Sequence, residues 1–180
     1  AKNIETKLIK ELTSMMKENR EDYEKFFKAF GANLKFGIYD QFGMNKDKLK
    51  DLLLFYSSEE KKMVTLQEYV SRMKEGQEGI YYACGETTGK IDLTPQVEQV
   101  KDKGYEILYC TDYVDEFALQ TLMTYEEKKF LNVAKDNLNL DTDEEKEEVK
   151  KLNEDNKDMF TMMKETLPDI KEVRFTNRLK

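Results

Sequence analysis

Three short apolar runs constrain the fold of this 180-residue chain more than any other feature. They are residues 80–84 (IYYAC), 106–110 (EILYC) and 130–134 (FLNVA), and their starts lie about 25 residues apart, which leaves room for a helix between them. Strands that alternate with helices are joined by right-handed crossovers and form a parallel sheet. We therefore expect an α/β fold, with a short parallel sheet inside a small three-layer α-β-α subdomain.

Helix signals between the apolar runs support this arrangement. Thr94 is suited to cap a helix, Pro95 fits its first position, and Gly104 stands at its expected end. A second helix is expected from about residue 115 to residue 122, where apolar residues recur at helical spacing.

The segment before the first apolar run is predicted to be mainly helical. Its apolar periodicity indicates two amphipathic helices that join near Asn19, the second ending at Gly31. Asn45 is suited to cap a short helix, and Thr65 with Glu68 has the pattern of a capping box. We assign residues 1–45 to a helical coil segment and residues 46–135 to the α-β-α subdomain.

Residues 136–180 are predicted to form a separate, truncated α+β tail. Five of the eight residues from 136 to 143 are Asp or Asn, which favours a linker. Thr142 begins a capping-box pattern before a long charged helix that runs to Pro168, and residues 170–175 are typical of the start of a strand. A lone helix and strand bury little surface, so we expect this tail to be the beginning of a further domain.

Composition excludes several classes of function. The chain has no His, which excludes a Ser-His-Asp triad, a Cys-His dyad and most zinc sites. Its net charge of -7 disfavours nucleic acids and anionic membranes as partners, and no run of about 18 apolar residues is present. Cys84 and Cys110 each end an apolar run, where buried reduced thiols are common, so we interpret them as structural thiols of a cytoplasmic protein.

Two further patterns are better explained by structure than by chemistry. The loop from Gly85 to Gly89 follows a strand, but it lacks the third glycine of a dinucleotide fingerprint and the Gly-Lys-Ser/Thr of a P-loop, so an ordinary turn is favoured. The acidic pairs at residues 59–60, 115–116 and 126–127 are interpreted as solvated carboxylates, because most of the 37 acidic residues must lie on the surface. We therefore assign no metal site and no catalytic residue.

The helix around Phe117 contains the strongest candidate for a binding surface. If the apolar face of this helix packs onto the sheet, Phe117 is left partly exposed beside Glu116 and Gln120. An exposed aromatic ring among polar groups is suited to contact partly folded proteins. The alternative is that Phe117 belongs to the core, where Phe is most often found.

Several long blocks of this sequence occur together in one known family. They are residues 26–31 (FFKAFG), 33–40 (NLKFGIYD), 69–77 (YVSRMKEGQ), 80–86 (IYYACGE), 104–108 (GYEIL) and 114–117 (VDEF). Taken in order, the blocks closely resemble the middle domain of the heat-shock protein 90 family. Residues 173–179 (VRFTNRL) resemble the opening of the family's C-terminal domain in bacterial members. The resemblance covers essentially the whole chain.

The resemblance implies a fragment of a homodimeric, ATP-driven molecular chaperone. The parent is expected to be a slow ATPase that binds ATP with magnesium in an N-terminal domain, contacts unfolded or partly folded clients and dimerises through its C-terminal domain. The fragment itself is expected to be a monomer without cofactor or ATPase activity, because the nucleotide domain and the arginine that completes the ATPase site lie upstream. Its expected partners are clients and its own flanking domains.

The resemblance also selects the residues of a client-binding surface. The family places this surface on the helix that matches residues 115–122, which singles out Glu116, Phe117 and Gln120. Bacterial members often have Glu, Trp and Asn at these positions, so Phe117 lacks the indole donor and Gln120 is one methylene longer. The resemblance favours an exposed Phe117 over a buried one.

Two alternative functions are compatible with the predicted fold. A nucleotide-binding α/β module would hold its ligand at the carboxyl ends of the strands, at residues 85–86 and 111–112. A passive spacer between flanking domains would bind neither nucleotide nor client.

Overall fold

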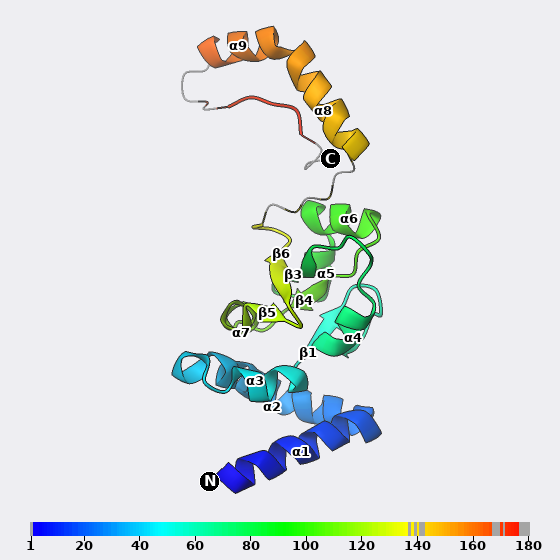
Figure 1. Ribbon diagram of the computed structural model, residues 1–180, viewed down its shortest axis with the longest axis vertical. Helices are drawn as coiled ribbons and strands as arrows, with labels where there is room; N and C mark the ends of the chain where they lie inside the picture. The colour runs from blue at the N-terminus through cyan, green and yellow to red at the C-terminus, as the bar shows by residue number, and fades with distance from the viewer. Residues whose placement is uncertain are drawn as a thin grey trace. The chain divides into compact units, whose positions relative to one another are not determined.

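A computed structural model describes residues 2–136, 138, 140, 143–166, 170 and 172–176. The chain divides into two compact units, Ala1–Leu138 and Asn139–Lys180. The first unit begins with helices α1 (Lys2–Glu18) and α2 (Arg20–Gly43), which meet at Asn19 as predicted (Figure 1). The Asn19 side chain accepts a hydrogen bond from the backbone N–H of Asp22 and so caps α2.

The predicted end of the second helix at Gly31 is wrong. Gly31 is buried inside α2, where an added Cβ would lie 2.7 Å from the ring of Phe27. The glycine therefore provides room for Phe27 and does not stop the helix. The helical path is broken instead at residues 40–42, where Gln41 and Phe42 have positive φ angles. A short helix α3 (Lys46–Leu49) and a 3-10 helix η1 (Lys50–Leu52) follow.

The centre of the sheet consists of the three apolar runs that the sequence indicated. They form β3 (Gly79–Cys84), β4 (Leu108–Cys110) and β6 (Lys128–Asn132). The central strand β3 pairs in parallel with β4 on one side and with β6 on the other. The α/β fold class is therefore confirmed, although β6 begins two residues before the predicted run, at Lys128.

The sheet is mixed rather than purely parallel, because three short antiparallel strands extend its edges. They are β1 (Leu54–Ser57), β2 (Met63–Thr65) and β5 (Thr124–Tyr125), and the strand order is β2-β1-β4-β3-β6-β5. The prediction of mainly helical structure before residue 79 is wrong for β1 and β2. Residues 52–55 are all buried, and such a continuous apolar run has neither a helical nor an alternating period.

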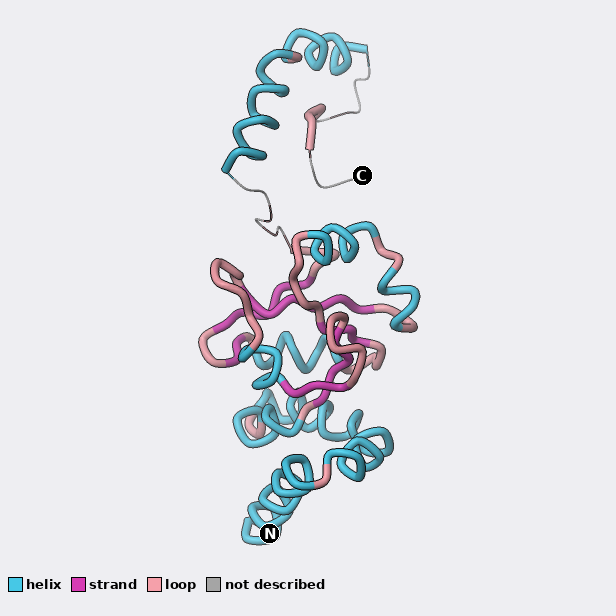
Figure 2. The backbone as a smooth tube through the Cα atoms, turned by 90° about the vertical axis from the view of Figure 1, so that its right-hand side faces the viewer, coloured by secondary structure: helices cyan, strands magenta, loops and turns pink. Residues whose placement is uncertain are grey.

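Helices cover both faces of the sheet (Figures 1 and 2). The helices α5 (Thr88–Asp92) and α6 (Pro95–Asp102) lie on one face, and α7 (Asp115–Leu122) lies on the other, with α2 beyond it. The helix α4 (Leu66–Ser71) follows β2 and begins with the predicted capping box of Thr65 and Glu68. Pro95 occupies the first turn of α6, and Gly104 beyond its end has a φ of +77°.

The described part of the second unit contains two helices where the sequence predicted one. They are α8 (Asp143–Asp155) and α9 (Lys157–Thr166), which are separated at Asn156. Thr142 and Pro168 lie outside the described residues. The described residues from 170 to 176 are not a strand, and the backbone of Phe175 instead exchanges two hydrogen bonds with the side chain of Asn153.

None of the described helices is both long enough and apolar enough to cross a membrane.

Candidate functional site

Helix α7 has one face in the core and one face in solvent. Val114, Ala118 and Leu122 are buried, as the predicted packing onto the sheet requires. Phe117 is 53% exposed and Gln120 is exposed, while Glu116 is half-buried. The alternative of a buried Phe117 is therefore excluded, and its role in binding stays a prediction.

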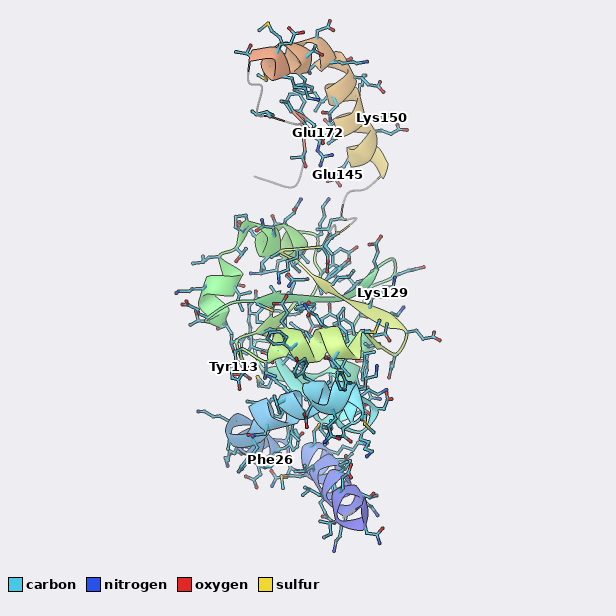
Figure 3. The ribbon with its side chains drawn as sticks, turned by 90° about the vertical axis from the view of Figure 1, so that its left-hand side faces the viewer. Phe26, Tyr113, Lys129, Glu145, Lys150 and Glu172 are labelled. Atoms are coloured by element: carbon cyan, nitrogen blue, oxygen red, sulfur yellow. The ribbon has the colours of Figure 1, made fainter. Side chains whose placement is uncertain are left out.

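Phe117 does not lie alone, because α2 runs beside α7 (Figure 3). Helix α2 contributes two further aromatic rings. The ring of Tyr39 lies 5.8 Å from the ring of Phe117, and the ring of Phe36 lies 6.3 Å from that of Tyr39. Each of the three residues is about half exposed. We call Phe36, Tyr39 and Phe117 the aromatic surface. Contiguous exposed apolar groups of this kind mark sites of protein contact.

Glu116 is held at the edge of α7 by groups from the other side of the helix. Its Oε1 accepts hydrogen bonds from Asn132 Nδ2 at 3.2 Å and from Lys135 Nζ at 2.5 Å. The hydrogen bond to Glu116 raises the pKa of Lys135 above its ordinary value. Glu116, Phe117 and Gln120 thus lie on one helix, as predicted. The ring of Phe117, however, contacts the ring of Tyr39 on α2.

The contribution of α2 was missed by sequence reasoning. Phe36 and Tyr39 stand three residues apart, so they share one face of the helix. Both belong to the block 33–40, which gave the family resemblance, and this was the available signal. Which helix would lie against α7 was not visible in the sequence, because the contact joins segments far apart in the chain.

A buried ion pair fixes α2 to the start of α7. Lys35 is 3% exposed, and its Nζ lies 2.5 Å from Asp115 Oδ1 and 2.7 Å from Asp112 Oδ2. The ammonium group also lies 5.0 Å from the centre of the Phe55 ring. The interpretation of residues 115–116 as a solvated acidic pair is therefore wrong for Asp115, which is 1% exposed.

The charges of this pair depend on each other. Burial alone would lower the pKa of Lys35, but attraction to Asp115 and hydrogen bonds to both carboxylates outweigh it and raise that pKa. Burial raises the pKa of Asp115, and Lys35 opposes that rise. Asp115 Oδ2 accepts a hydrogen bond from the backbone N–H of Asp112, and Oδ1 is paired with the ammonium group of Lys35.

The carboxyl ends of the strands, where a nucleotide would bind in the alternative interpretation, contain a locally satisfied turn. Thr87 caps α5 by accepting a hydrogen bond from the backbone N–H of Lys90, and Lys90 pairs with Glu86. The backbone N–H of Gly85 donates to the carbonyl of Cys110. In the described part of the chain, no group of three or more His, Cys, Asp or Glu residues is arranged to hold a metal ion.

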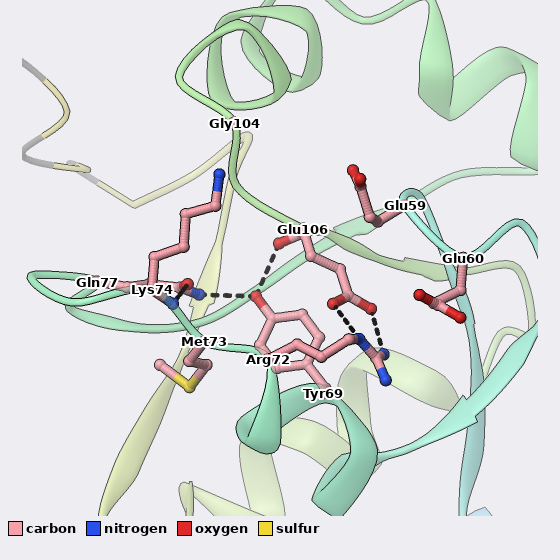
Figure 4. Close-up of a pocket in the computed structure, with 9 residues that line it drawn as sticks. All are labelled: Glu59, Glu60, Tyr69, Arg72, Met73, Lys74, Gln77, Gly104 and Glu106. Carbon is pink, nitrogen blue, oxygen red and sulfur yellow. Dashed lines mark hydrogen bonds and ion pairs between the residues drawn. The ribbon is translucent and has the colours of Figure 1, made fainter.

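A cavity of about 280 Å³ lies between α4 and the chain leading into β4 (Figure 4). The hydroxyl of Tyr69 is at its centre and donates to the carbonyl of Glu106 at 2.7 Å. The same hydroxyl accepts from Gln77 Nε2 and from the backbone N–H of Tyr81. Arg72 binds the Glu106 carboxylate through two hydrogen bonds. These polar groups satisfy one another, so we interpret the cavity as structural.

Replacing Tyr69 with Phe should lower the free energy of unfolding by about 1.5 kcal/mol, because buried donors and the Glu106 carbonyl lose their partner. Urea unfolding followed by circular dichroism would measure the change. Tyr113→Phe is the matched control, since Tyr113 is 83% exposed. Equal stability of the two variants would contradict the interpretation.

Comparisons with known proteins define first the class and then the family. The middle domain of a Plasmodium falciparum heat shock protein has a similar fold, with a TM-score of 0.68 and 30% identity, over 75% of this chain and 57% of that one. The Hsp90 protein family model matches residues 1–180, so the chain belongs to the Hsp90 family. The predicted resemblance is confirmed.

Curated relatives are bacterial chaperones. The chaperone protein HtpG of Clostridium perfringens is 58% identical over 181 residues, and that of Bacillus subtilis is 54% identical over the same length. Each alignment covers 100% of this chain and 29% of the relative. The chain thus spans less than a third of the length of these relatives.

Proposed function

We propose that this chain is the segment of an ATP-dependent chaperone that contacts unfolded or partly folded proteins, and that the contact is made by the aromatic surface with Glu116 and Gln120 at its edge. The observation that supports this most directly is the contact between Tyr39 and Phe117, two half-exposed rings from different helices. Single exposed rings are common on folded domains, but contiguous exposed apolar groups are typical of interaction surfaces.

The chemistry of this surface suits weak and varied partners. Three rings supply apolar contact area with few rotatable bonds, and the neighbouring amide and carboxylate accept or donate hydrogen bonds to exposed backbone. A surface this small is expected to bind with a Kd on the order of micromolar or weaker. Weak binding allows rapid release of the client. A chaperone that does not retain its client requires such rapid release.

The same geometry supports a route by which the rest of the parent protein acts on the surface. We propose that ATP with magnesium binds to the parent's N-terminal domain, and that the resulting motion reaches α7 through α2. Lys35 joins the two helices through Asp112 and Asp115, so α2 cannot shift without acting on the start of α7. We also propose that the parent protein acts in the cytoplasm.

Nuclear magnetic resonance titration tests the proposed surface. The isotopically labelled chain would be titrated with a destabilised client protein at modest salt, and every backbone amide would be followed. Shifts clustered on Phe36, Tyr39, Phe117 and Gln120 are expected. Shifts at residues 85–90 would instead favour a ligand site at the strand ends, and no shifts anywhere would favour a passive spacer.

A further inference from the structure

The two cysteines of the chain are neighbours across the sheet. Cys84 ends β3 and Cys110 ends β4, and the two are directly paired in the parallel register. Directly opposed residues of neighbouring strands point their side chains to the same face, so both thiols lie on the same side of the sheet. Both cysteines are free. Cys110 is buried, as predicted, but Cys84 is exposed, so the prediction of a buried thiol is wrong for Cys84.

The spacing of the two strands permits a bridge between these residues. Neighbouring strands lie about 4.7–4.9 Å apart, which is within the range of Cα separations in disulfides. The same spacing exceeds the usual Cβ separation of a bridge, and the ladder here is held by the hydrogen bond from Gly85 N–H to the carbonyl of Cys110. A disulfide at this site would therefore be strained, and strained disulfides are readily reduced.

The two thiols differ in the way that a reactive and a resolving cysteine differ. The hydrogen bond from Cys110 lowers the pKa of Cys84, against the opposing effects of burial and of the Glu116 and Asp115 carboxylates; Lys135 adds to the lowering. Burial raises the pKa of Cys110 well above its ordinary value. The exposed thiol is thus the more easily ionised one, and thiolate character with exposure determines reactivity toward oxidants.

We propose that Cys84 and Cys110 form a reversible dithiol site, which hydroperoxides oxidise to an intramolecular disulfide and low-molecular-weight thiols reduce. Neither cysteine belongs to the proposed client-binding surface, so this proposal does not rest on the proposed function.

The reaction balances in two steps. The Cys84 thiolate attacks one peroxide oxygen, the O–O bond breaks, and Cys84 becomes a sulfenic acid while the other oxygen leaves as hydroxide or alkoxide and takes up a proton. The Cys110 sulfur then attacks the Cys84 sulfur, the S–O bond breaks, and the proton of Cys110 leaves with the hydroxide as water. With hydrogen peroxide, two thiols and one peroxide give one disulfide and two waters.

The test is oxidation of the folded 180-residue chain with hydrogen peroxide, followed by alkylation of the remaining thiols and mass spectrometry without reductant. Both thiols are expected to disappear together, with loss of two hydrogen atoms, no covalent dimer and full recovery by dithiothreitol. Cys110→Ser is expected to stop at a Cys84 sulfenic acid that dimedone captures. Cys84→Ser is expected to slow oxidation at least about tenfold, because the remaining thiol is buried.

Three results would overturn the proposal. They are addition of oxygen to wild-type Cys84 without a bridge, formation of intermolecular bridges alone, and formation of the internal bridge no faster in the folded chain than in urea. The comparison with the urea-unfolded chain separates a site created by the β3–β4 pairing from two cysteines that meet by chance.

Discussion

Replacing Lys35 with Met is expected to lower the free energy of unfolding of the first unit by about 3–5 kcal/mol, because the change leaves a buried carboxylate without its counter-charge. Asp115 is 1% exposed and cannot recover its lost partner by turning to water. The variant also loses the contact of the ammonium group with the rings of Phe27 and Phe55. Urea unfolding followed by circular dichroism would measure the loss.

The loss should depend on pH in a direction that identifies Asp115. Burial already raises the pKa of Asp115, and removal of Lys35 takes away the charge that opposes this rise. A group whose folded-state pKa is raised adds stability below its unfolded pKa of about 4, and this stability is lost as pH rises through the folded pKa. The deficit of Lys35→Met relative to wild type should therefore shrink as pH falls from 7 towards about 4.

Two further variants separate the ion pair from other effects of a Lys-to-Met change. Lys28→Met is the matched control, since Lys28 lies on the same helix and is exposed. Adding Asp115→Leu to Lys35→Met should recover part of the lost stability, because an apolar pair can replace a buried ion pair. If Lys35→Met and Lys28→Met unfold at the same urea concentration, the ion pair does not hold α2 to α7.

The sequence predicted the parts of the fold that have a strong local signature. The runs 80–84, 106–110 and 130–134 are largely apolar, as is typical of the inner strands of a covered sheet, and β3 and β4 are almost entirely buried. The three antiparallel strands β1, β2 and β5 have two to four residues each, so their patterns are too short to be told from a helix or a turn. The predicted helix end at Gly31 was wrong for a different reason. Gly31 makes room for the Phe27 ring, and this contact is not visible in the sequence pattern.

The candidate site shows the same division. Exposure of Phe117 followed from the apolar face of its own helix together with the family resemblance. Tyr39, Lys35 and the pairing of Cys84 with Cys110 depend on contacts between segments that are far apart in the chain. Lys35 in particular lies in an ordinary amphipathic pattern, and only the packing of α2 against α7 makes it a buried charge.

Replacing both Phe117 and Tyr39 with Ala is expected to weaken binding of a destabilised client by about 2 kcal/mol, or roughly 30-fold in Kd. The two rings contact each other, so each single variant should lose more than half of this effect and the two losses should not add. Binding would be measured by fluorescence anisotropy of a labelled client, with unfolding curves to show that the variants remain folded.

Two comparisons make this prediction specific to the aromatic surface. Leu93→Ala removes an apolar side chain that is 84% exposed between α5 and α6, on the other face of the sheet, and should leave Kd unchanged. Phe117→Trp restores a larger ring with an N–H donor and should bind at least as tightly as wild type. If a folded Phe117→Ala/Tyr39→Ala variant binds with the wild-type Kd, the aromatic surface is not part of the client-binding site. Both rings are half exposed, so a client that bound there would contact them directly.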